Sequence, residues 1–224
     1  MKIGLIIAIE RELKSFLNNG SKIKSYTVSN RIVYKTKIGK HEIFATKSGY
    51  GVIDAASATQ LLITKFDCSI IMNFGVTGAL EPGLKVDELF VVRKTCNYDY
   101  DVSPIDPVKE HQYAEFKDEF IPLDDSLISF TKTIYPDIKE AVVASGAKFI
   151  DKKEDKLELN KLGCNICDME IAAIARVCFL CNVKCLSIKC ISDTFEGDGG
   201  DFNKNVLNSA EKAFKVLMGL LNKI

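Results

Sequence analysis

Two acidic segments each follow an apolar run that predicts a buried strand, and their carboxyl groups could take part in proton transfer. Glu10-Arg11-Glu12 directly follows the apolar run at residues 2–8, and Asp193 follows the apolar run at 183–191. Ligands of α/β sheets bind outside the carboxyl ends of the strands, so a carboxylate at either place could act as an acid or a base. Both acids also have an ordinary structural interpretation, since acids stabilise helix N-termini and an Asp in a turn bonds to nearby backbone.

A third acidic segment, Asp168-Met169-Glu170, stands at the start of an apolar helix predicted over 169–181. The carboxylate of Asp168 is typical of a helix cap. Glu170, predicted to lie two residues inside the helix, could instead face a pocket. The two oxygens of one carboxylate match two vicinal sugar hydroxyls, so capping and sugar binding both stay open.

Two glycine-rich segments adjoin these acids. Residues 73–80 contain Gly75 and Gly78 and follow a predicted strand, so either backbone N–H groups approach a ligand closely here or the segment is an ordinary strand-to-helix turn. Neither this segment nor Gly49-Tyr50-Gly51 matches the dinucleotide or P-loop pattern, which argues against a dinucleotide or ATP site. The other glycine-rich segment that adjoins an acid, residues 196–200, predicts a flexible lid beside Asp193.

Four cysteines have the spacing of a zinc site, with Cys164-x2-Cys167 followed by Cys178-x2-Cys181. The second pair lies in the predicted apolar helix, however, and a free Cys in such a place behaves as a small buried hydrophobe. We therefore expect no metal site, with a metal-binding protein kept as an alternative.

Length and composition narrow the class of protein. The 224 residues suit one large domain, expected over 1–224, and 47% of them are hydrophobic, which excludes a disordered chain. The formal net charge of zero favours neither nucleic acid nor an anionic membrane as a partner. The first apolar run leads into charged residues without a cleavage site, so we expect a cytoplasmic protein with reduced thiols.

Short apolar runs alternate with segments of helical period, which predicts a three-layer α/β/α fold with a central mixed, mostly parallel sheet. The strands from 22 to 46 are separated by hairpin-length gaps and predict an antiparallel meander. The aromatic stretch 97–122 is predicted as a long, functional loop. Strands are predicted at 2–8, 22–28, 31–37, 41–46, 68–74, 89–92, 141–146 and 183–191, and helices at 10–18, 51–65, 126–134, 151–162, 169–181 and 202–223.

Seven motifs occur in register along nearly the whole chain, and together they are far more specific than any one alone. With them the chain resembles the 5'-methylthioadenosine/S-adenosylhomocysteine nucleosidases of the nucleoside phosphorylase superfamily. The motifs are Met1-Lys2-Ile3-Gly4 with Ala8-Ile9-Glu10-Arg11-Glu12, Ser48-Gly49-Tyr50-Gly51, Gly75-Val76-Thr77-Gly78-Ala79-Leu80, Asp101-Val102, Ser145-Gly146-Ala147-Lys148-Phe149-Ile150, Asp168-Met169-Glu170 and Ile191-Ser192-Asp193.

The resemblance implies hydrolysis of the N-glycosidic bond of a 5'-substituted adenosine with release of adenine, as in methionine salvage. It implies a small nucleoside substrate, no metal or organic cofactor, and a homodimer. Two alternatives stay open, namely a purine nucleoside phosphorylase and a non-catalytic nucleoside- or metal-binding protein on the same fold. One phosphorylase branch carries an Arg just before the Gly75 turn, where this chain has Met72-Asn73-Phe74, which favours water over phosphate.

Residue roles follow from the resemblance by position. Glu12 matches the base that activates water, and Asp193 matches the acid that protonates the purine at N7. Glu170 matches the carboxylate on the ribose 2' and 3' hydroxyls, with Met169 packed on the sugar. Phe149 matches the ring stacked on the base. The other expected substrate-binding residues are Ile150, whose backbone would read the adenine edge, with Val102 and Phe202 beside the base and the 5'-substituent, and Ala8, Ile9, Tyr50, Val76, Thr77, Gly78, Asp168 and Ser192.

The chain departs from the family pattern at several of these places. Val76 stands where Ser is common, and Lys189 replaces an Arg near the water, keeping the charge but losing the planar fork. Tyr50 replaces a smaller aliphatic residue, and Ile105 replaces an aromatic residue that often reaches into the neighbouring subunit. These changes leave the preferred 5'-substituent open.

Overall fold

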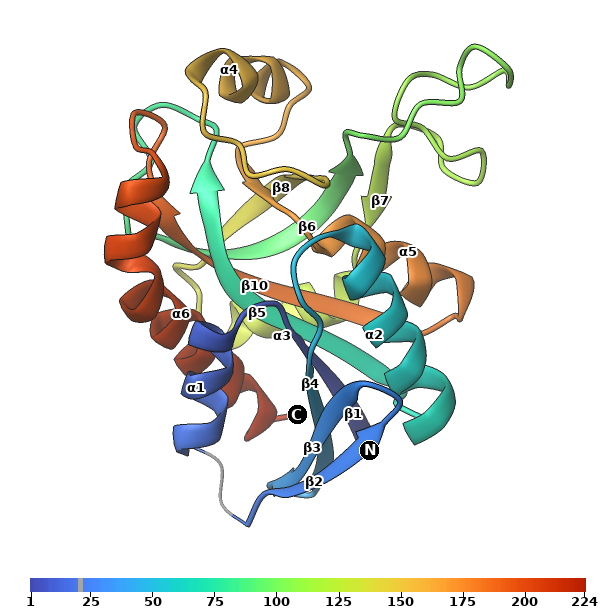
Figure 1. Cartoon of the computed structure of the whole chain (residues 1–224), viewed down its shortest axis with the longest axis vertical. Coiled ribbons are helices and arrows are strands. Elements are labelled where there is room, and N and C mark those ends of the chain that lie inside the picture. The colour runs from blue at the N-terminus through green and yellow to red at the C-terminus, as the bar shows by residue number, and fades with distance from the viewer. Residues whose placement is uncertain (20–21) are drawn as a thin grey trace.

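The computed structural model describes residues 1–19 and 22–224, and in these residues ten strands form one mixed sheet (Figure 1). The strands are β1 (Lys2–Ile7), β2 (Lys24–Val28), β3 (Arg31–Ile38), β4 (His41–Lys47), β5 (Ile70–Ala79), β6 (Leu89–Asn97), β7 (Phe120–Pro122), β8 (Lys139–Ser145), β9 (Ile166–Asp168) and β10 (Lys184–Asp193). The helices are α1 (Glu10–Asn19), α2 (Val52–Phe66), α3 (Asp125–Ile134), α4 (Lys153–Lys161), α5 (Ile171–Leu180) and α6 (Gly199–Leu221).

The centre of the sheet is built from strands far apart in the sequence. β1 pairs in parallel with β4 and β5, and β10 pairs in parallel with β5. β10 also pairs antiparallel with β6, and the pairings then run through β8 and β9 back to β5. This part of the sheet therefore closes on itself, whereas β2, β3 and β4 form the predicted antiparallel meander at its open edge.

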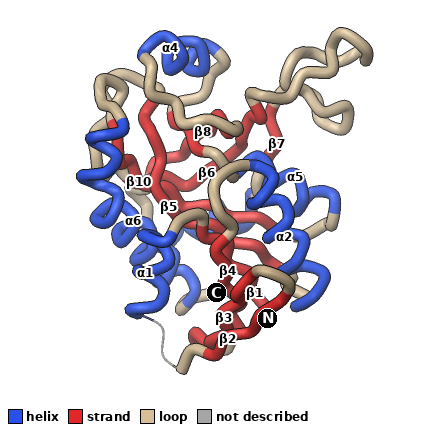
Figure 2. Tube along the Cα trace, viewed as in Figure 1, coloured by secondary structure: helices blue, strands red, loops and turns tan. Residues whose placement is uncertain are grey.

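Helices cover the sheet on two sides, as Figure 2 shows. α6 packs against β5 and β10 with α1 beside it, while α2 and α5 pack together on the other side. The first side buries an aromatic cluster in which the ring of Phe214 lies 5.2 Å from that of Phe74 and 6.5 Å from that of Phe16. The predicted α/β fold with helices on both sides of a mixed sheet is thus confirmed. Within the described residues, no helix is long and apolar enough to cross a membrane.

Several predicted boundaries are wrong, and the three that follow bear on the site. β5 does not end at Gly75 but continues to Ala79, because residues of β10 pair with it as far as Gly78. β10 likewise continues to Asp193, which is therefore a strand residue and not part of a turn. α5 begins at Ile171, so Glu170 is the residue that precedes the helix and does not lie inside it.

β6 continues past its predicted end at 92 to Asn97, and the rest of the predicted loop 97–122 is irregular apart from β7, which pairs with β6. Tyr100 stacks on Tyr113 with ring centres 4.0 Å apart, and the guanidinium of Arg176 lies 4.5 Å from the Tyr113 ring centre. The predicted lid is also more ordered than expected. Gly199 and Gly200 form the first turn of α6, where the Asp198 carboxylate accepts from the Gly200 N–H at 2.8 Å.

Candidate active site

A pocket opens at the carboxyl ends of β1, β5 and β10, on the edge where α/β folds bind ligands. It brings together nearly all of the residues singled out in the sequence. Those that line it are Ala8, Ile9, Glu12, Tyr50, Val76, Thr77, Gly78, Phe149, Ile150, Asp168, Met169, Glu170, Ser192, Asp193 and Phe202.

Glu12 lies in the first turn of α1 and is only 3% exposed. Its Oε2 accepts hydrogen bonds from the N–H groups of Ala8 and Ile9, both at 3.2 Å, and its Oε1 accepts from the Val76 N–H at 3.0 Å. A Cβ on Gly75 would collide with Oε1, so this glycine leaves the room that the carboxylate occupies. Glu12 therefore satisfies the start of its helix, as the ordinary interpretation requires, and also faces the pocket.

Burial raises the pKa of Glu12, and the Lys189 charge and the three backbone N–H groups oppose this rise. The N–H groups donate to the ionised carboxylate and so favour its charged form. The side chain is thus a buried carboxylate that can ionise and accept a proton.

Asp193, the last residue of β10, lies across the pocket and is 1% exposed. Its Oδ1 accepts a hydrogen bond from the Ser192 hydroxyl at 2.8 Å. A Cβ on Gly78 would come within 2.8 Å of its Oδ2, so the neighbouring strand needs glycine here. Burial raises the pKa of Asp193 above its usual value, which favours the protonated form that an acid catalyst requires.

Glu170 stands at the N-cap position of α5, and its Oε1 accepts from the Gly51 N–H at 2.9 Å. That contact ties the start of α5 to the start of α2. Burial and the nearby Asp168 charge raise the pKa of Glu170.

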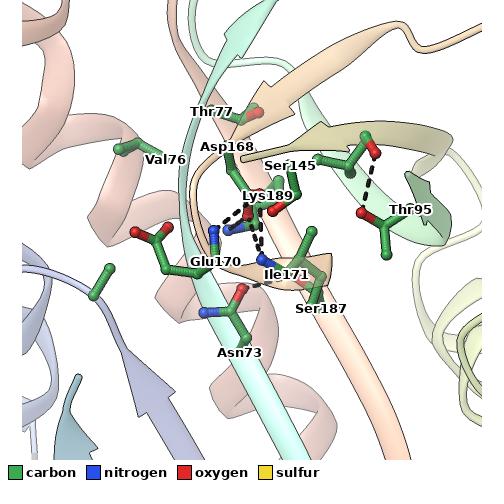
Figure 3. A network of polar contacts seen from close by, with 12 residues as sticks. Asn73, Val76, Thr77, Thr95, Ser145, Asp168, Glu170, Ile171, Ser187 and Lys189 are labelled. Atoms are coloured by element: carbon green, nitrogen blue, oxygen red, sulfur yellow. Dashed lines mark hydrogen bonds and ion pairs between the residues drawn. The ribbon is translucent and has the colours of Figure 1, made fainter. Parts of the chain in front are cut away.

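A buried ion pair lies behind this carboxylate (Figure 3). Lys189 Nζ is 2.7 Å from Asp168 Oδ2, and both side chains are almost fully buried. Asp168 also accepts from the N–H groups of Glu170 and Ile171, each at 3.3 Å, so it caps α5 as the sequence suggested. Burial alone would lower the pKa of Lys189, but Asp168, Glu170 and Glu12 together raise it. Lys189 is therefore a charged group whose ammonium is already ion-paired with the Asp168 carboxylate.

Aromatic side chains form the mouth of the pocket. Phe149 is 43% exposed and meets Phe202 edge to face with ring centres 5.5 Å apart. Tyr50 is 61% exposed at the rim. An open aromatic face beside buried carboxylates suits a flat, polar ring such as a nucleobase.

One predicted residue does not join the site. Val102 lies in the irregular segment between β6 and β7 and is not among the residues that line the pocket. Two lining residues were not predicted, Lys148 and Cys167. Both adjoin predicted residues in sequence, which is the signal that could have identified them. Burial raises the pKa of the Cys167 thiol, so it adds an apolar wall and not a nucleophile.

The cysteine spacing does not produce a cluster. Cys164 and Cys178 are buried, and Cys181 caps α5. In the part of the chain that the structure describes, no group of three or more His, Cys, Asp or Glu residues is placed to hold a metal ion. The zinc alternative therefore gains no support from the geometry.

Comparisons with known proteins agree on one family. The sequence model of the phosphorylase superfamily matches residues 2–222. A 5'-methylthioadenosine/S-adenosylhomocysteine nucleosidase of Buchnera aphidicola subsp. Schizaphis graminum is 31% identical over 231 residues, covering 100% of this chain and 97% of the relative. An aminodeoxyfutalosine nucleosidase of Campylobacter jejuni is 26% identical and is covered in full, as is this chain.

A solved structure gives the same result for the fold. The 5'-methylthioadenosine/S-adenosyl homocysteine nucleosidase of Helicobacter pylori, in complex with a pyrrolopyrimidine-containing compound, superimposes with a TM-score of 0.92. The two sequences are 26% identical, and the match covers 100% of this chain and 99% of the other.

Proposed function

The chain belongs to the phosphorylase superfamily, and on that premise we propose that it is a nucleosidase that hydrolyses the N-glycosidic bond of 5'-substituted adenosines. The observation that carries this proposal is the pair of buried carboxyl groups, Glu12 and Asp193, that line one pocket. Burial raises the pKa of both; the Lys189 charge and three backbone N–H donors oppose the rise at Glu12, and the Ser192 hydroxyl and the Lys156 charge oppose it at Asp193.

Asp193 is the general acid of the proposed reaction. An adenine anion is a poor leaving group, so the purine must be protonated at N7 as the bond to ribose breaks. A positioned acid contributes about two to four orders of magnitude to the rate. The proton comes from the carboxyl group of Asp193, whose pKa is raised by burial.

Glu12 is the general base, and water is the nucleophile. The ribosyl group becomes oxocarbenium-like as the base departs, and a carboxylate beside it removes a proton from the attacking water. Glu170 binds the ribose 2' and 3' hydroxyls, and in its ionised form, which its pKa of about 8 limits at neutral pH, it also favours the developing positive charge. Met169 packs on the sugar and Phe149 stacks on the base.

The cationic groups of the pocket favour water over phosphate as the nucleophile. A phosphorylase needs cations that are free to bind phosphate. Among the described residues that line the pocket, Lys148 is paired with Asp155 at 3.1 Å. Lys189, just behind the lining, is paired with Asp168. The buried Lys189 is therefore not free to bind phosphate, whereas Lys148 is held only by an exposed ion pair of the kind that contributes little.

An assay of adenine release, run with and without phosphate, tests the proposal. We expect release in phosphate-free buffer, with free ribose derivative as the second product. Strict dependence on phosphate would replace the hydrolase by a phosphorylase. Nucleoside binding without any turnover, for every nucleoside tried, would favour the non-catalytic alternative.

The substrate is proposed as a class. The two kinds of relative act on methylthioadenosine and adenosylhomocysteine or on aminodeoxyfutalosine, according to their names. These nucleosides share the adenosine half that Asp193, Glu170 and Phe149 are proposed to bind. Measuring kcat/KM on a panel of them ranks the 5'-substituents. Adding 2'-deoxyadenosine, which lacks the 2' hydroxyl, tests the role of Glu170.

A further inference from the structure

A buried lysine lies next to the segment that follows Asp193. Lys156 belongs to α4, in the charged region predicted as a helix over 151–162, yet its side chain is fully buried. Its ammonium group donates to three backbone carbonyls, those of Thr194 at 3.0 Å, Phe195 at 3.3 Å and Gly197 at 2.7 Å. These carbonyls belong to the four residues directly after Asp193.

This arrangement is unusual because a buried ammonium group ordinarily has a carboxylate partner. No carboxylate of the described residues forms an ion pair with Lys156. The charge is instead compensated by backbone dipoles, and charge-assisted hydrogen bonds of this kind are short and directional. The three bonds therefore hold the turn between the end of β10 and the start of α6, which belongs to neither the strand nor the helix.

The turn itself is short, and the ring of its Phe195 is buried. The Gly197 N–H donates to the Thr194 carbonyl at 3.0 Å, so that carbonyl accepts from Lys156 as well. On the surface of the same turn, Lys153 forms an ion pair with Glu196 at 2.7 Å. Exposed pairs such as this contribute little, so the buried contacts of the turn are those of Lys156 together with the burial of the Phe195 ring.

We propose that Lys156 is a positioning residue for Asp193. Lys156 holds the backbone of residues 194–197 and supplies a positive charge close to the carboxyl group of Asp193. The proposal rests on the function proposed above, in which Asp193 is the general acid. It also connects two parts of the pocket, because α4 directly follows the segment that contains Phe149 and Ile150.

The charges around Asp193 come from several elements. Lys156 lowers the pKa of Asp193 below the value that burial and the neighbouring Asp201 and Asp151 would otherwise give it. Cys167, on β9, faces the same carboxyl group but is a neutral thiol, because burial raises its pKa. Removing the Lys156 charge should therefore raise the pKa of Asp193 further.

The test compares substitutions at two lysines of the same helix. Lys156→Met removes the charge and all three donors, and we expect kcat/KM to fall by about 10²-fold, as for other small misplacements of a catalytic group. The alkaline limb of its pH profile should move to higher pH, since this limb reports the ionisation of the acid. Lys156→Arg keeps the charge and should keep the limb near that of the wild type. Lys153→Met is the matched control, since it removes an exposed charge of the same helix that pairs with Glu196 of the turn, and should change kcat/KM by less than about twofold.

A second measurement does not depend on activity. Amide hydrogen exchange in residues 194–198 should be faster in Lys156→Gln, which lacks the charge but keeps N–H donors for folding, and unchanged in Lys153→Met. The proposal would be overturned if the wild type is active and the Lys156 variants keep both its alkaline limb and its slow exchange. Loss of activity with an unmoved limb would also overturn it, because a merely structural role predicts that result. Failure of the proposed function is distinct, since the wild type itself would then release no adenine.

Discussion

At the scale of single residues, hydrogen-bond donors oppose the effect of burial on the charge state of each buried carboxyl group, and they are most numerous at Glu12. Burial raises the pKa of Glu12, Glu170 and Asp193 alike. Glu12, however, accepts three backbone N–H bonds, whereas Asp193 accepts from the hydroxyl of Ser192. Fixed N–H donors favour the anion. Glu12 is therefore suited to be the base and Asp193 the acid.

The first residue-scale prediction concerns Asp193→Asn. The amide cannot supply a proton, so we expect kcat to fall by about 10²- to 10⁴-fold. Nucleoside binding should change little, because the amide keeps the shape of the side chain. Steady-state kinetics and calorimetric titration measure the two effects. Undiminished turnover would exclude Asp193 as the acid.

The same substitution should stabilise the folded protein at neutral pH. In the unfolded chain an Asp ionises near pH 3.9, whereas burial raises the pKa of the folded-state Asp193. Between these two values the folded state holds a proton that the unfolded state has lost, so the wild type loses stability as the pH rises. Asn does not titrate.

Denaturant titrations of both proteins from pH 3 to pH 8 provide the measurement. The stability of Asp193→Asn relative to the wild type should increase through this window and level off above the folded-state pKa. A difference that stays constant with pH would contradict the raised pKa.

At the scale of elements, strong patterns were predictable and strand ends were not. The long apolar strands, the meander and the helices follow from periodicity. β7 and β9 have only three residues each, too few to show any period. The ends of β5 and β10 were missed because glycine and serine usually signal turns, whereas here pairing between the two strands extends them.

These misses explain what could and could not be predicted about the site. The acids at strand ends and the register of the motifs located most of the pocket. The position of Glu170 ahead of α5 depends on the cap formed by Asp168, which is the last residue of the short strand β9. The burial of Lys156 was not predictable from composition, because a charged helix normally faces solvent.

The prediction at this scale compares two strand glycines. Gly75→Ala on β5 would place a methyl group against Glu12 Oε1. We expect it to lower kcat/KM by about 10²-fold through displacement of the base, with a stability loss of about 1–3 kcal/mol.

Gly4→Ala on β1 is the control for overpacking. Its Cβ would come within 2.5 Å of the Ile71 Cδ1, inside the core and away from the pocket. It should cost a similar amount of stability, about 1–3 kcal/mol, and leave kcat/KM unchanged. Equal kinetic losses in both variants would show that Gly75 acts only through packing.

At the scale of the whole molecule, the pocket unites residues from the segment directly after the first strand to the last helix. A ligand that contacts all of these elements binds the folded state and not the unfolded chain. It stabilises the fold by about 2.7 kcal/mol at a concentration of 100 Kd, which corresponds to a rise in Tm of about 5–10 °C for a chain of this length.

Thermal unfolding of Asp193→Asn with and without nucleoside measures this effect without turnover. We expect an adenosine analogue to raise Tm, and a pyrimidine nucleoside, which lacks N7, to raise it less. Equal shifts would argue against purine recognition. The expected homodimer stays a prediction at this scale, and sedimentation of the purified protein tests it.

The central position of β10 has a consequence for how the protein is made. A ribosome releases the chain from its N-terminus, so β5 and β6 emerge long before the strand that joins them in the finished sheet. Until residues 184–193 appear, the edges that β10 will occupy have no backbone partner from it, and the pocket lacks Asp193. Catalytic competence is therefore acquired late in synthesis, and a nascent chain stalled before this strand would expose an unpaired, apolar edge that chaperones are suited to cover.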